Sequence, residues 1–335
     1  MKTILVTGSA GFIGSALTAR MLEIGNKVIG IDNLNNYYDI NLKKARLKRF
    51  INNQNYTNHI IDIEDQPSLK EIFDQNEIDI VINLAAQAGV RYSLINPQKY
   101  ISTNILGFTN ILEESKRHNI NHLIYASSSS VYGLNKSIPF STSDMTNHPA
   151  SVYAATKKSN ELLAHTYSYL YGIPTTGLRF FTVYGPWDRP DMALQQFAKS
   201  IMNGEPIKLF NYGHHKRDFT YIDDIVEGVI KVASKPARSN SNWDSHNPSA
   251  KSSLCPYQIY NIGNNSMVEL ERYVDILEKE LGRKAKRELL PMQSGDIENT
   301  FANVDDLISD FKYKPSTAVE IGVKKFAEWF KDYYL

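Results

Sequence analysis

The sequence predicts an α/β protein built on a doubly wound parallel sheet, followed by a smaller α/β domain. Short apolar runs alternate along the chain with stretches whose apolar residues recur at helical spacing, as strands and helices in turn require. The first run, residues 4–6, stops at three glycines spaced three apart, Gly8, Gly11 and Gly14. A helical pattern follows at once, so a buried strand leads directly into a helix.

The glycine turn predicts a site for the pyrophosphate of a dinucleotide. Gly8 suits a tight turn, Gly11 lets backbone approach the phosphates, and Gly14 lets the helix pack close to the strand. The helix begins near Phe12 and Ile13, and its free N–H groups and positive dipole end then face the phosphates. A turn that binds nothing is the alternative, because the spacing departs from the commoner G-x-G-x-x-G.

The second apolar run, residues 28–31, ends in Asp32, where an acid is expected to meet the ribose hydroxyls. A carboxylate accepts two hydrogen bonds from the diol and repels a 2′-phosphate, which favours NAD over NADP. Asn33 follows Asp32 in the sequence. Lys43, in the next helix, is a candidate contact for the adenosine side of the cofactor, and a solvated basic helix face is the alternative for its neighbourhood.

The next two apolar runs, residues 59–63 and 78–84, predict two more strands that end at the same edge of the sheet. Asp62 is placed either to accept a hydrogen bond from the adenine amino group or to cap the following helix. The second run leads into small residues, Ala85 and Ala86, where ribose and phosphates need room. Asn104, in the helix predicted near residues 100–117, either fixes the loop beneath the nicotinamide or is a satisfied core amide.

The catalytic candidates lie after the fifth strand, residues 122–126. Four serines, residues 127–130, follow that strand, and a later helix opens with Tyr153 and Lys157 one turn apart on one face. A phenol titrates near a pH of about 10, so a lone tyrosine is a poor base at neutral pH. A cation beside it, Lys157 together with a nicotinamide ring, favours the phenolate and makes Tyr153 a proton acceptor.

These features together resemble the extended short-chain dehydrogenase/reductase family. The segments that carry the resemblance are the glycine turn, Asp32 and residues 83–87, 127–133 and 153–157. A narrower resemblance is to the nucleotide-sugar 4-epimerases, and most of all to those that act on UDP-glucuronate. It rests on residues 89–93, 179–187, 189–193 and 210–213. Two positions depart from the family pattern, because Asp188 stands where glycine is usual and Asn303 where aspartate is usual.

The resemblance implies a Rossmann-type NAD-binding domain over residues 1–177 and a nucleotide-sugar-binding domain over residues 178–335, with segments exchanged between them. It implies a catalytic role for Tyr153, Lys157 and Ser128, with the exact serine open within residues 127–130. The implied contacts with NAD are Gly8, Gly11, Phe12, Ile13, Gly14, Asp32, Asn33, Lys43, Asp62, Ile63, Leu84, Ala85, Ala86, Asn104, Ser127, Tyr153, Lys157 and Phe180. The implied contacts with a UDP-sugar are Gln87, Arg91, Ser128, Ser129, Tyr153, Thr182, Arg189, Leu209, Phe210, Arg217 and Asp296.

Three of these substrate candidates have open alternatives. Arg217 suits a diphosphate, because a guanidinium binds phosphate in a bidentate way, but an ion pair with Asp218, Asp223 or Asp224 is the alternative. Arg189, together with Thr182, suits either the diphosphate or a sugar carboxylate. Asp296 either touches uridine or caps a turn. Leu209 and Phe210 offer an apolar edge to the flat base.

The residues favour epimerisation at C4 over related reactions. NAD beside a tyrosine base suits removal of a hydride from C4 while Tyr153 takes the hydroxyl proton, and return of the hydride to the other face inverts the centre. Related decarboxylases and dehydratases carry an acid just before Val131, where this chain has Ser129 and Ser130. A neutral or N-acetylated hexose is an alternative substrate. A regulator that only binds NAD would need neither Tyr153 nor Lys157.

Composition limits the other partners. The formal net charge of +1 gives no electrostatic case for nucleic acid or an anionic membrane. No apolar run approaches the roughly 18 residues of a membrane span. Cys255 is the single cysteine, which excludes an intramolecular disulfide, and no metal site is expected at His214 and His215. The sequence enters a strand without a leader, which predicts a cytoplasmic protein, and the resemblance implies a homodimer through the helices near residues 100–117 and 153–170.

Overall fold

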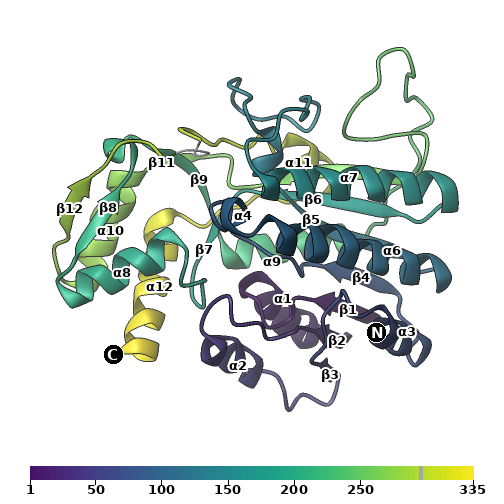
Figure 1. Cartoon of the computed structure of the whole chain (residues 1–335), viewed down its shortest axis with the longest axis horizontal. Coiled ribbons are helices and arrows are strands. Elements are labelled where there is room, and N and C mark those ends of the chain that lie inside the picture. The colour runs from purple at the N-terminus through teal and green to yellow at the C-terminus, as the bar shows by residue number, and fades with distance from the viewer. Residues whose placement is uncertain (294–296) are drawn as a thin grey trace.

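The computed structural model describes residues 1–293 and 297–335, and it contains a seven-stranded parallel sheet flanked by helices (Figure 1). The strand order is β10-β6-β5-β4-β1-β2-β3. The strands are β1 Thr3–Thr7, β2 Lys27–Ile31, β3 Tyr56–His59, β4 Ile80–Asn83, β5 His122–Ser128, β6 Thr175–Phe180 and β10 Tyr257–Ile262. The chain turns back between β1 and β4, which is where ligands bind in such sheets. The predicted fold class is confirmed.

Both faces of the sheet are covered, which explains why its strands are almost continuously apolar. Ile4 and Val6 of β1 belong to one hydrophobic cluster together with Leu17, and Leu5 belongs to a second cluster together with Phe108. The helices against the first cluster are α1 Phe12–Glu23 and α9 Ile222–Ala233, with α2 Ile40–Lys48 beside them. The helices against the second are α3 Gln66–Asp74, α6 Phe108–Arg117 and α7 Val152–Tyr171.

A second group of elements lies beside the carboxyl ends of the large sheet, on the left of Figure 1. It contains a three-stranded sheet in the order β11-β9-β7 and a strand pair of β12 and β8. The strands are β7 Thr182–Tyr184, β8 Pro206–Leu209, β9 Lys216–Tyr221, β11 Met267–Glu269 and β12 Lys286–Leu289. The helices are α8 Ala193–Asn203, α10 Leu270–Leu281 and α12 Val319–Tyr334, and α11 Asp305–Phe311 packs against β10.

Two predicted elements differ in the structure. The sequence predicts the third strand over residues 59–63, but β3 ends at His59. The residues after it form a turn instead, in which Asp62 accepts a hydrogen bond from the backbone N–H of Glu64 and Asp65 caps α3. The helix predicted near residues 100–117 is three pieces, α5 Pro97–Tyr100, a π-helix Ile101–Gly107 and then α6. A π-helical turn has no hydrophobic signature of its own, so helical periodicity does not reveal it.

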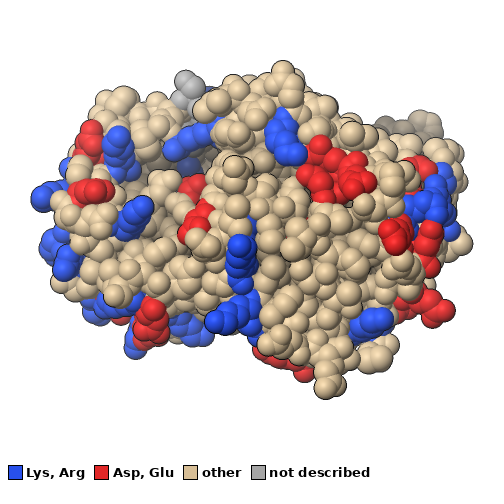
Figure 2. Space-filling view, turned by 60° about the horizontal axis from the view of Figure 1, so that its bottom comes forward, with Lys and Arg blue, Asp and Glu red and all other residues tan. Residues whose placement is uncertain are grey.

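The boundary predicted at residue 177 falls inside β6, and β10, from the C-terminal half, forms the edge of the large sheet beside β6. The division into two domains with exchanged segments therefore remains a proposal. Residues 234–256 connect α9 to β10 as a long, mostly exposed loop, as their Ser, Asn and Pro content predicts (Figure 1). In the part of the chain that the structure describes, no helix is both long and apolar enough to cross a membrane. On the face drawn in Figure 2, positive and negative side chains are interspersed.

Candidate active site

The glycine turn between β1 and α1 has the geometry that a pyrophosphate needs. Gly8 has a φ of +73°, a left-handed conformation that favours glycine, and its N–H donates to the Ile31 carbonyl at 2.7 Å. A Cβ on Gly14 would lie 2.0 Å from the Gly8 carbonyl oxygen, so only glycine lets α1 come this close. Helix α1 begins after Gly11 without a side-chain cap, so its first N–H groups are available to an anion.

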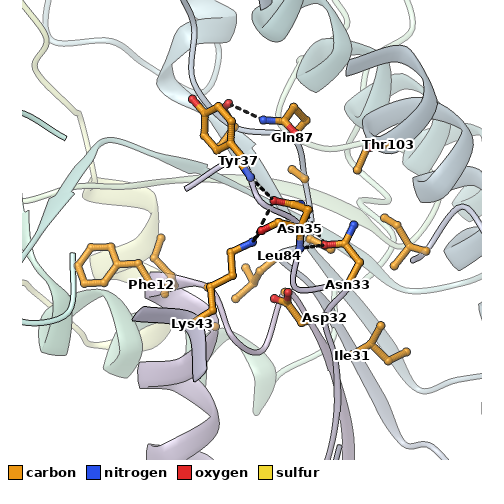
Figure 3. A pocket seen from close by; sticks show the side chains of 18 of the residues that line it. Phe12, Ile31, Asp32, Asn33, Asn35, Tyr37, Lys43, Leu84, Gln87 and Thr103 are labelled. Carbon is orange, nitrogen blue, oxygen red and sulfur yellow. Dashed lines mark hydrogen bonds between the residues drawn. The ribbon is translucent and has the colours of Figure 1, made fainter. Parts of the chain in front are cut away.

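Asp32 stands at the end of β2 beside this turn. Its two carboxylate oxygens accept hydrogen bonds from the backbone N–H groups of Ala10, at 3.1 Å, and Leu34, at 2.9 Å. These bonds fix the carboxylate on the wall of a cavity that the glycine turn also lines (Figure 3). The other predicted cofactor residues on the wall of this cavity are Phe12, Ile13, Asn33, Lys43, Asp62, Ile63, Leu84, Ala85 and Ala86. The residues present therefore fit an NAD molecule.

The structure contradicts one alternative each for Lys43 and Asp62, while their contacts with the cofactor stay predictions. Lys43 is buried rather than solvated, and its Nζ donates to the carbonyl oxygen of Asn35 at 2.8 Å and to its side-chain oxygen at 3.0 Å (Figure 3). Burial lowers the pKa of Lys43. Asp62 accepts a hydrogen bond from Asn33 Nδ2 at 2.8 Å on the cavity wall, whereas the residue that caps α3 is Asp65.

Asn104 holds the loop after β4 against helix α7. Its Oδ1 accepts from the backbone N–H of Gln87 at 2.8 Å, and its Nδ2 donates to the Gln87 carbonyl at 3.1 Å and to Thr156 Oγ1 at 3.0 Å. Asn104 is buried and acts through Gln87, which lines the first cavity. Asn104 is thus a hydrogen-bonded core amide that fixes the loop after β4, and the place of this loop beneath the nicotinamide stays a prediction.

Tyr153, Ser128 and Lys157 line a second cavity that is continuous with the first. Leu84, Ala86 and Arg189 are on the walls of both. Burial raises the pKa of the Tyr153 phenol, and Ser128 is the only one of the four serines that acts against this shift. Its Oγ donates to Ser130 Oγ at 3.1 Å and accepts from the Ser130 N–H at 3.1 Å. The choice of Ser128 as the catalytic serine stays a prediction. Ser151 caps α7 by accepting from Ala154 N at 3.1 Å, and so places Tyr153 in the first turn. Lys157 lies one turn further along the helix.

The charge relation between Tyr153 and Lys157 differs from the expectation. Lys157 Nζ donates to the carbonyl oxygen of Ala126 at 2.8 Å, and burial lowers its pKa to about 8. Burial also raises the pKa of the Tyr153 phenol, while the Ser128 hydrogen bond and the Arg189 charge act more weakly in the opposite direction. Lys157 is not among the charges that lower the pKa of Tyr153 in the protein without its ligands, and the joint effect of Lys157 and a nicotinamide ring stays a prediction.

Ser127 and Ser129 have different surroundings from Ser128. Both line the second cavity, but the Ser127 hydroxyl donates to Glu161 Oε1 at 2.7 Å, away from Tyr153. Glu161 in turn forms a buried ion pair with Arg179, which the sequence analysis did not identify as part of the site. Phe180, at the end of β6, also lines the second cavity, and its contact with the cofactor stays a prediction.

The predicted substrate residues surround the far side of the second cavity. Arg91, Thr182, Arg189, Phe210 and Arg217 all line it. Arg189 is held by Asp191, with Nε–Oδ1 and Nη2–Oδ2 distances of 2.9 and 2.7 Å, and although burial opposes the charge, this carboxylate raises the pKa of Arg189.

The remaining substrate candidates are placed as follows. The guanidinium of Arg91 lies 5.1 Å from the centre of the Phe210 ring, and Arg217 Nη1 donates to the Glu298 carbonyl at 2.7 Å. The side chain of Leu209 is buried in the hydrophobic core, so Phe210 supplies the apolar edge. Asp296 lies outside the described residues.

Sequence reasoning missed Tyr37, which lines both cavities. Its ring centre lies 5.1 Å from that of Tyr92, and its hydroxyl lies 3.4 Å from Asp191 Oδ2. The signal was present, because two tyrosines follow closely on Asp32 in a polar loop. Within residues 1–293 and 297–335, no cluster of three or more His, Cys, Asp or Glu side chains could hold a metal ion.

Known proteins match the chain over nearly its whole length. It is 54% identical over 331 residues to Protein CapI of Staphylococcus aureus, covering 99% of both chains. It is 44% identical over 331 residues to a probable UDP-glucuronate 4-epimerase of Rhizobium meliloti, covering 98% of this chain and 97% of that one. The crystal structure of UDP-glucuronic acid 4-epimerase from Bacillus cereus, in complex with UDP-glucuronic acid and NAD, superposes with a TM-score of 0.89 at 32% identity, covering 99% and 100%.

A family model described as the NAD dependent epimerase/dehydratase family matches residues 4–263. This match and the NAD-bound neighbour confirm the predicted resemblance, the predicted cofactor and the predicted isomerase class. The chain belongs to the NAD dependent epimerase/dehydratase family.

Proposed function

We propose that this protein converts UDP-glucuronate to UDP-galacturonate by inverting C4 of the sugar. The observation that carries the proposal is that Tyr153, Ser128 and Lys157 share the wall of a cavity that continues into the dinucleotide site. The relatives named as UDP-glucuronate 4-epimerases support the choice of sugar. When bound beside Tyr153, NAD takes a hydride from C4 and returns it.

In this proposal Tyr153 acts as its phenolate, which a positively charged nicotinamide ring and the Lys157 ammonium would favour once NAD is bound, and its oxygen accepts the proton of the C4 hydroxyl at the cavity wall. Lys157, with a pKa of about 8, is mostly an ammonium at neutral pH and stabilises negative charge on that side of the cavity. The 4-keto sugar then rotates about its diphosphate and presents its other face. Tyr153 returns the proton, and C4 is inverted without net redox change.

Two features of the cavity favour inversion of a uronate over its decarboxylation. Decarboxylases and dehydratases of this type carry an acidic residue at the positions of Ser129 and Ser130, which line the second cavity here. These two serines offer no carboxyl group for proton transfer at C5. Arg189 and Thr182 line the cavity and offer a cation and a hydroxyl to an anionic group of the substrate. That group is either the sugar carboxylate or the diphosphate.

The test is the product that the purified protein forms from UDP-glucuronate. UDP-galacturonate would support the proposal, and a UDP-pentose would show decarboxylation instead. An unchanged substrate, with turnover of UDP-glucose or UDP-N-acetylglucosamine, would move the proposal to a neutral or N-acetylated hexose. Product is separated by anion-exchange chromatography and identified by NMR.

The Tyr153→Phe variant tests the proposed base. It should retain NAD and lose turnover by about 100-fold or more, because a positioned proton acceptor typically contributes that much. The matched control is Tyr167→Phe on the same helix, whose hydroxyl bonds Glu113 on α6 and should leave the rate unchanged. Near-normal turnover of Tyr153→Phe would remove Tyr153 from this role.

We also propose that the protein forms a homodimer through the helical face predicted from the resemblance. Leu162 and Leu170 of α7 are each 59% exposed, and Leu106, in the π-helical turn before α6, is 52% exposed. A double substitution Leu162→Glu and Leu170→Glu should shift the protein from a dimer to a monomer in sedimentation velocity. A wild-type protein that is monomeric at micromolar concentration would contradict the proposal.

A further inference from the structure

Arg46 of α2 is fully buried and uses every N–H group of its guanidinium, although it is not on the wall of either cavity. Its Nε donates to the carbonyl oxygen of Trp187 at 3.0 Å. Its Nη2 donates to the same oxygen at 2.7 Å and to the carbonyl oxygen of Asp188 at 3.2 Å. Its Nη1 donates to the Ala10 carbonyl at 3.1 Å and to the Tyr38 hydroxyl at 2.6 Å. Because all five N–H donors have acceptors, these hydrogen bonds offset the free-energy cost of burying the charge.

The acceptors belong to segments that are far apart in the sequence but meet at the site. Ala10 lies inside the glycine turn, and its N–H donates to Asp32. Tyr38 lines the dinucleotide cavity. Trp187 and Asp188 directly precede Arg189, which lines both cavities. One rigid, planar group therefore joins the turn that receives the phosphates to the loop that carries the proposed anion-binding arginine.

The loop at Trp187 needs such support, because its backbone is strained. Trp187 has a φ of +68°, in the left-handed region that residues other than glycine rarely adopt. Its ring lies 5.3 Å from those of Trp329 and Tyr333, so the C-terminal helix α12 fixes the side chain while Arg46 fixes the carbonyl. The Asp188 carbonyl also accepts from Gln195 Nε2 at 2.6 Å. Arg46 of α2 and Gln195 of α8 thus hold the carbonyl groups before Arg189, and α12 holds the Trp187 ring.

We propose that Arg46 is a positioning residue for substrate binding, which sets the place of Arg189 relative to the glycine turn. The inference rests on the proposed function, since it assumes that Arg189 binds an anionic group of UDP-glucuronate. Arg46 touches neither ligand and acts through the Trp187 and Asp188 carbonyls. Loss of the Arg46 guanidinium should let the strained loop relax and move Arg189. A displacement of about 1 Å is enough to weaken the binding of substrate by Arg189 strongly.

The test measures binding of UDP-glucuronate to the NAD-loaded protein by calorimetry, which does not depend on turnover. Arg46→Lys keeps the charge but cannot make the five-bond pattern, and it should raise the Kd about tenfold while NAD content stays near that of the wild type. Lys48→Met, an exposed residue of the same helix, is the control and should change the Kd less than about twofold. An unchanged Kd in Arg46→Lys would overturn the inference.

A double-variant cycle separates positioning from a general structural role. In an Arg189→Gln background, Arg46→Lys should raise the Kd by less than about twofold, because residues that act through one another are not additive. A full tenfold effect in that background would overturn the inference. Tyr38→Phe, which removes one acceptor and keeps the ring, is the milder second variant and should weaken binding by a smaller factor, about threefold. A wild-type protein that does not bind UDP-glucuronate would instead overturn the proposed function.

Discussion

Arg179 and Glu161 form a buried, fork-shaped ion pair beside Ser127 of β5. Their Nε–Oε1 and Nη2–Oε2 distances are 2.8 and 3.0 Å, and their side chains are 0% and 1% exposed. Ser127 donates to Glu161 Oε1 at 2.7 Å, and Arg179 Nη1 donates to the Tyr132 hydroxyl at 3.1 Å. Glu161 lies on α7, two turns after Tyr153, and Arg179 lies on β6, so the pair fixes α7 to the sheet.

Breaking this pair should destabilise the protein strongly. Arg179→Met leaves the buried Glu161 carboxylate with only the partly exposed Lys158 ammonium, 3.1 Å from Oε2, and we expect the free energy of unfolding to fall by about 3–5 kcal/mol. The double variant Arg179→Met and Glu161→Gln should lose less than Arg179→Met alone, because no fully buried charge then lacks its partner. Urea unfolding monitored by circular dichroism measures both.

An exposed pair of the same residue types provides the control. Arg272 and Glu320 form an ion pair with side chains 65% and 48% exposed, and Arg272→Met should cost less than about 1 kcal/mol. Equal losses for Arg179→Met and Arg272→Met would show that the buried pair does not support the fold.

The sequence could predict much of the wall of the dinucleotide cavity, because many of its residues directly follow a strand in a recognisable local pattern. Gly14 is an example, since close packing of helix and strand requires glycine at that position whatever the rest of the chain does. The sequence could not predict in which direction a side chain points. Ser127 and Ser128 are neighbours in a strand and so point to opposite sides, but which of them meets Tyr153 depends on the register of the sheet.

Contacts between distant segments could not be predicted from one sequence. Arg46 appeared as one of several basic residues on a helix, and its burial depends on the Trp187 carbonyl, 141 residues away. The bond from Lys157 to the Ala126 carbonyl likewise depends on how α7 packs on β5. Helical spacing placed Tyr153 and Lys157 on one face, but it did not determine the partner of the ammonium.

The pH dependence of catalysis should reflect Lys157. Burial lowers its pKa to about 8, so its ammonium is present below that pH and is lost as the pH rises through it. If the ammonium stabilises negative charge near Tyr153, kcat/KM should decrease above a pH of about 8, because this parameter reports the ionisation of the free enzyme. Steady-state rates between pH 6 and 9.5 measure it. A profile that stays level to pH 9.5 would contradict the role of Lys157.

The stability of the protein should respond to pH through Asp188. This side chain is fully buried, one carboxyl oxygen accepts from the N–H of Arg189 at 2.6 Å, and the other has no hydrogen-bond partner among residues 1–293 and 297–335. Burial raises the pKa of Asp188 to about 8, well above its value of about 4 in an unfolded chain. Between these values the folded protein holds a proton that the unfolded chain has lost, so this contribution to stability decreases as the pH rises from about 4 to about 8.

Asp188→Asn should remove that dependence, because an amide has nearly the same shape and does not ionise. We expect the substitution to raise Tm more at pH 8 than at pH 5, since at the lower pH the wild-type carboxyl is already neutral in the folded protein. Scanning calorimetry at the two pH values measures the difference, and Asp332→Asn on the exposed end of α12 should shift Tm by the same small amount at both. If Asp188→Asn shifts Tm equally at pH 5 and pH 8, the Asp188 carboxyl is not held neutral in the folded protein, and the proposed pH dependence of stability through this residue is wrong.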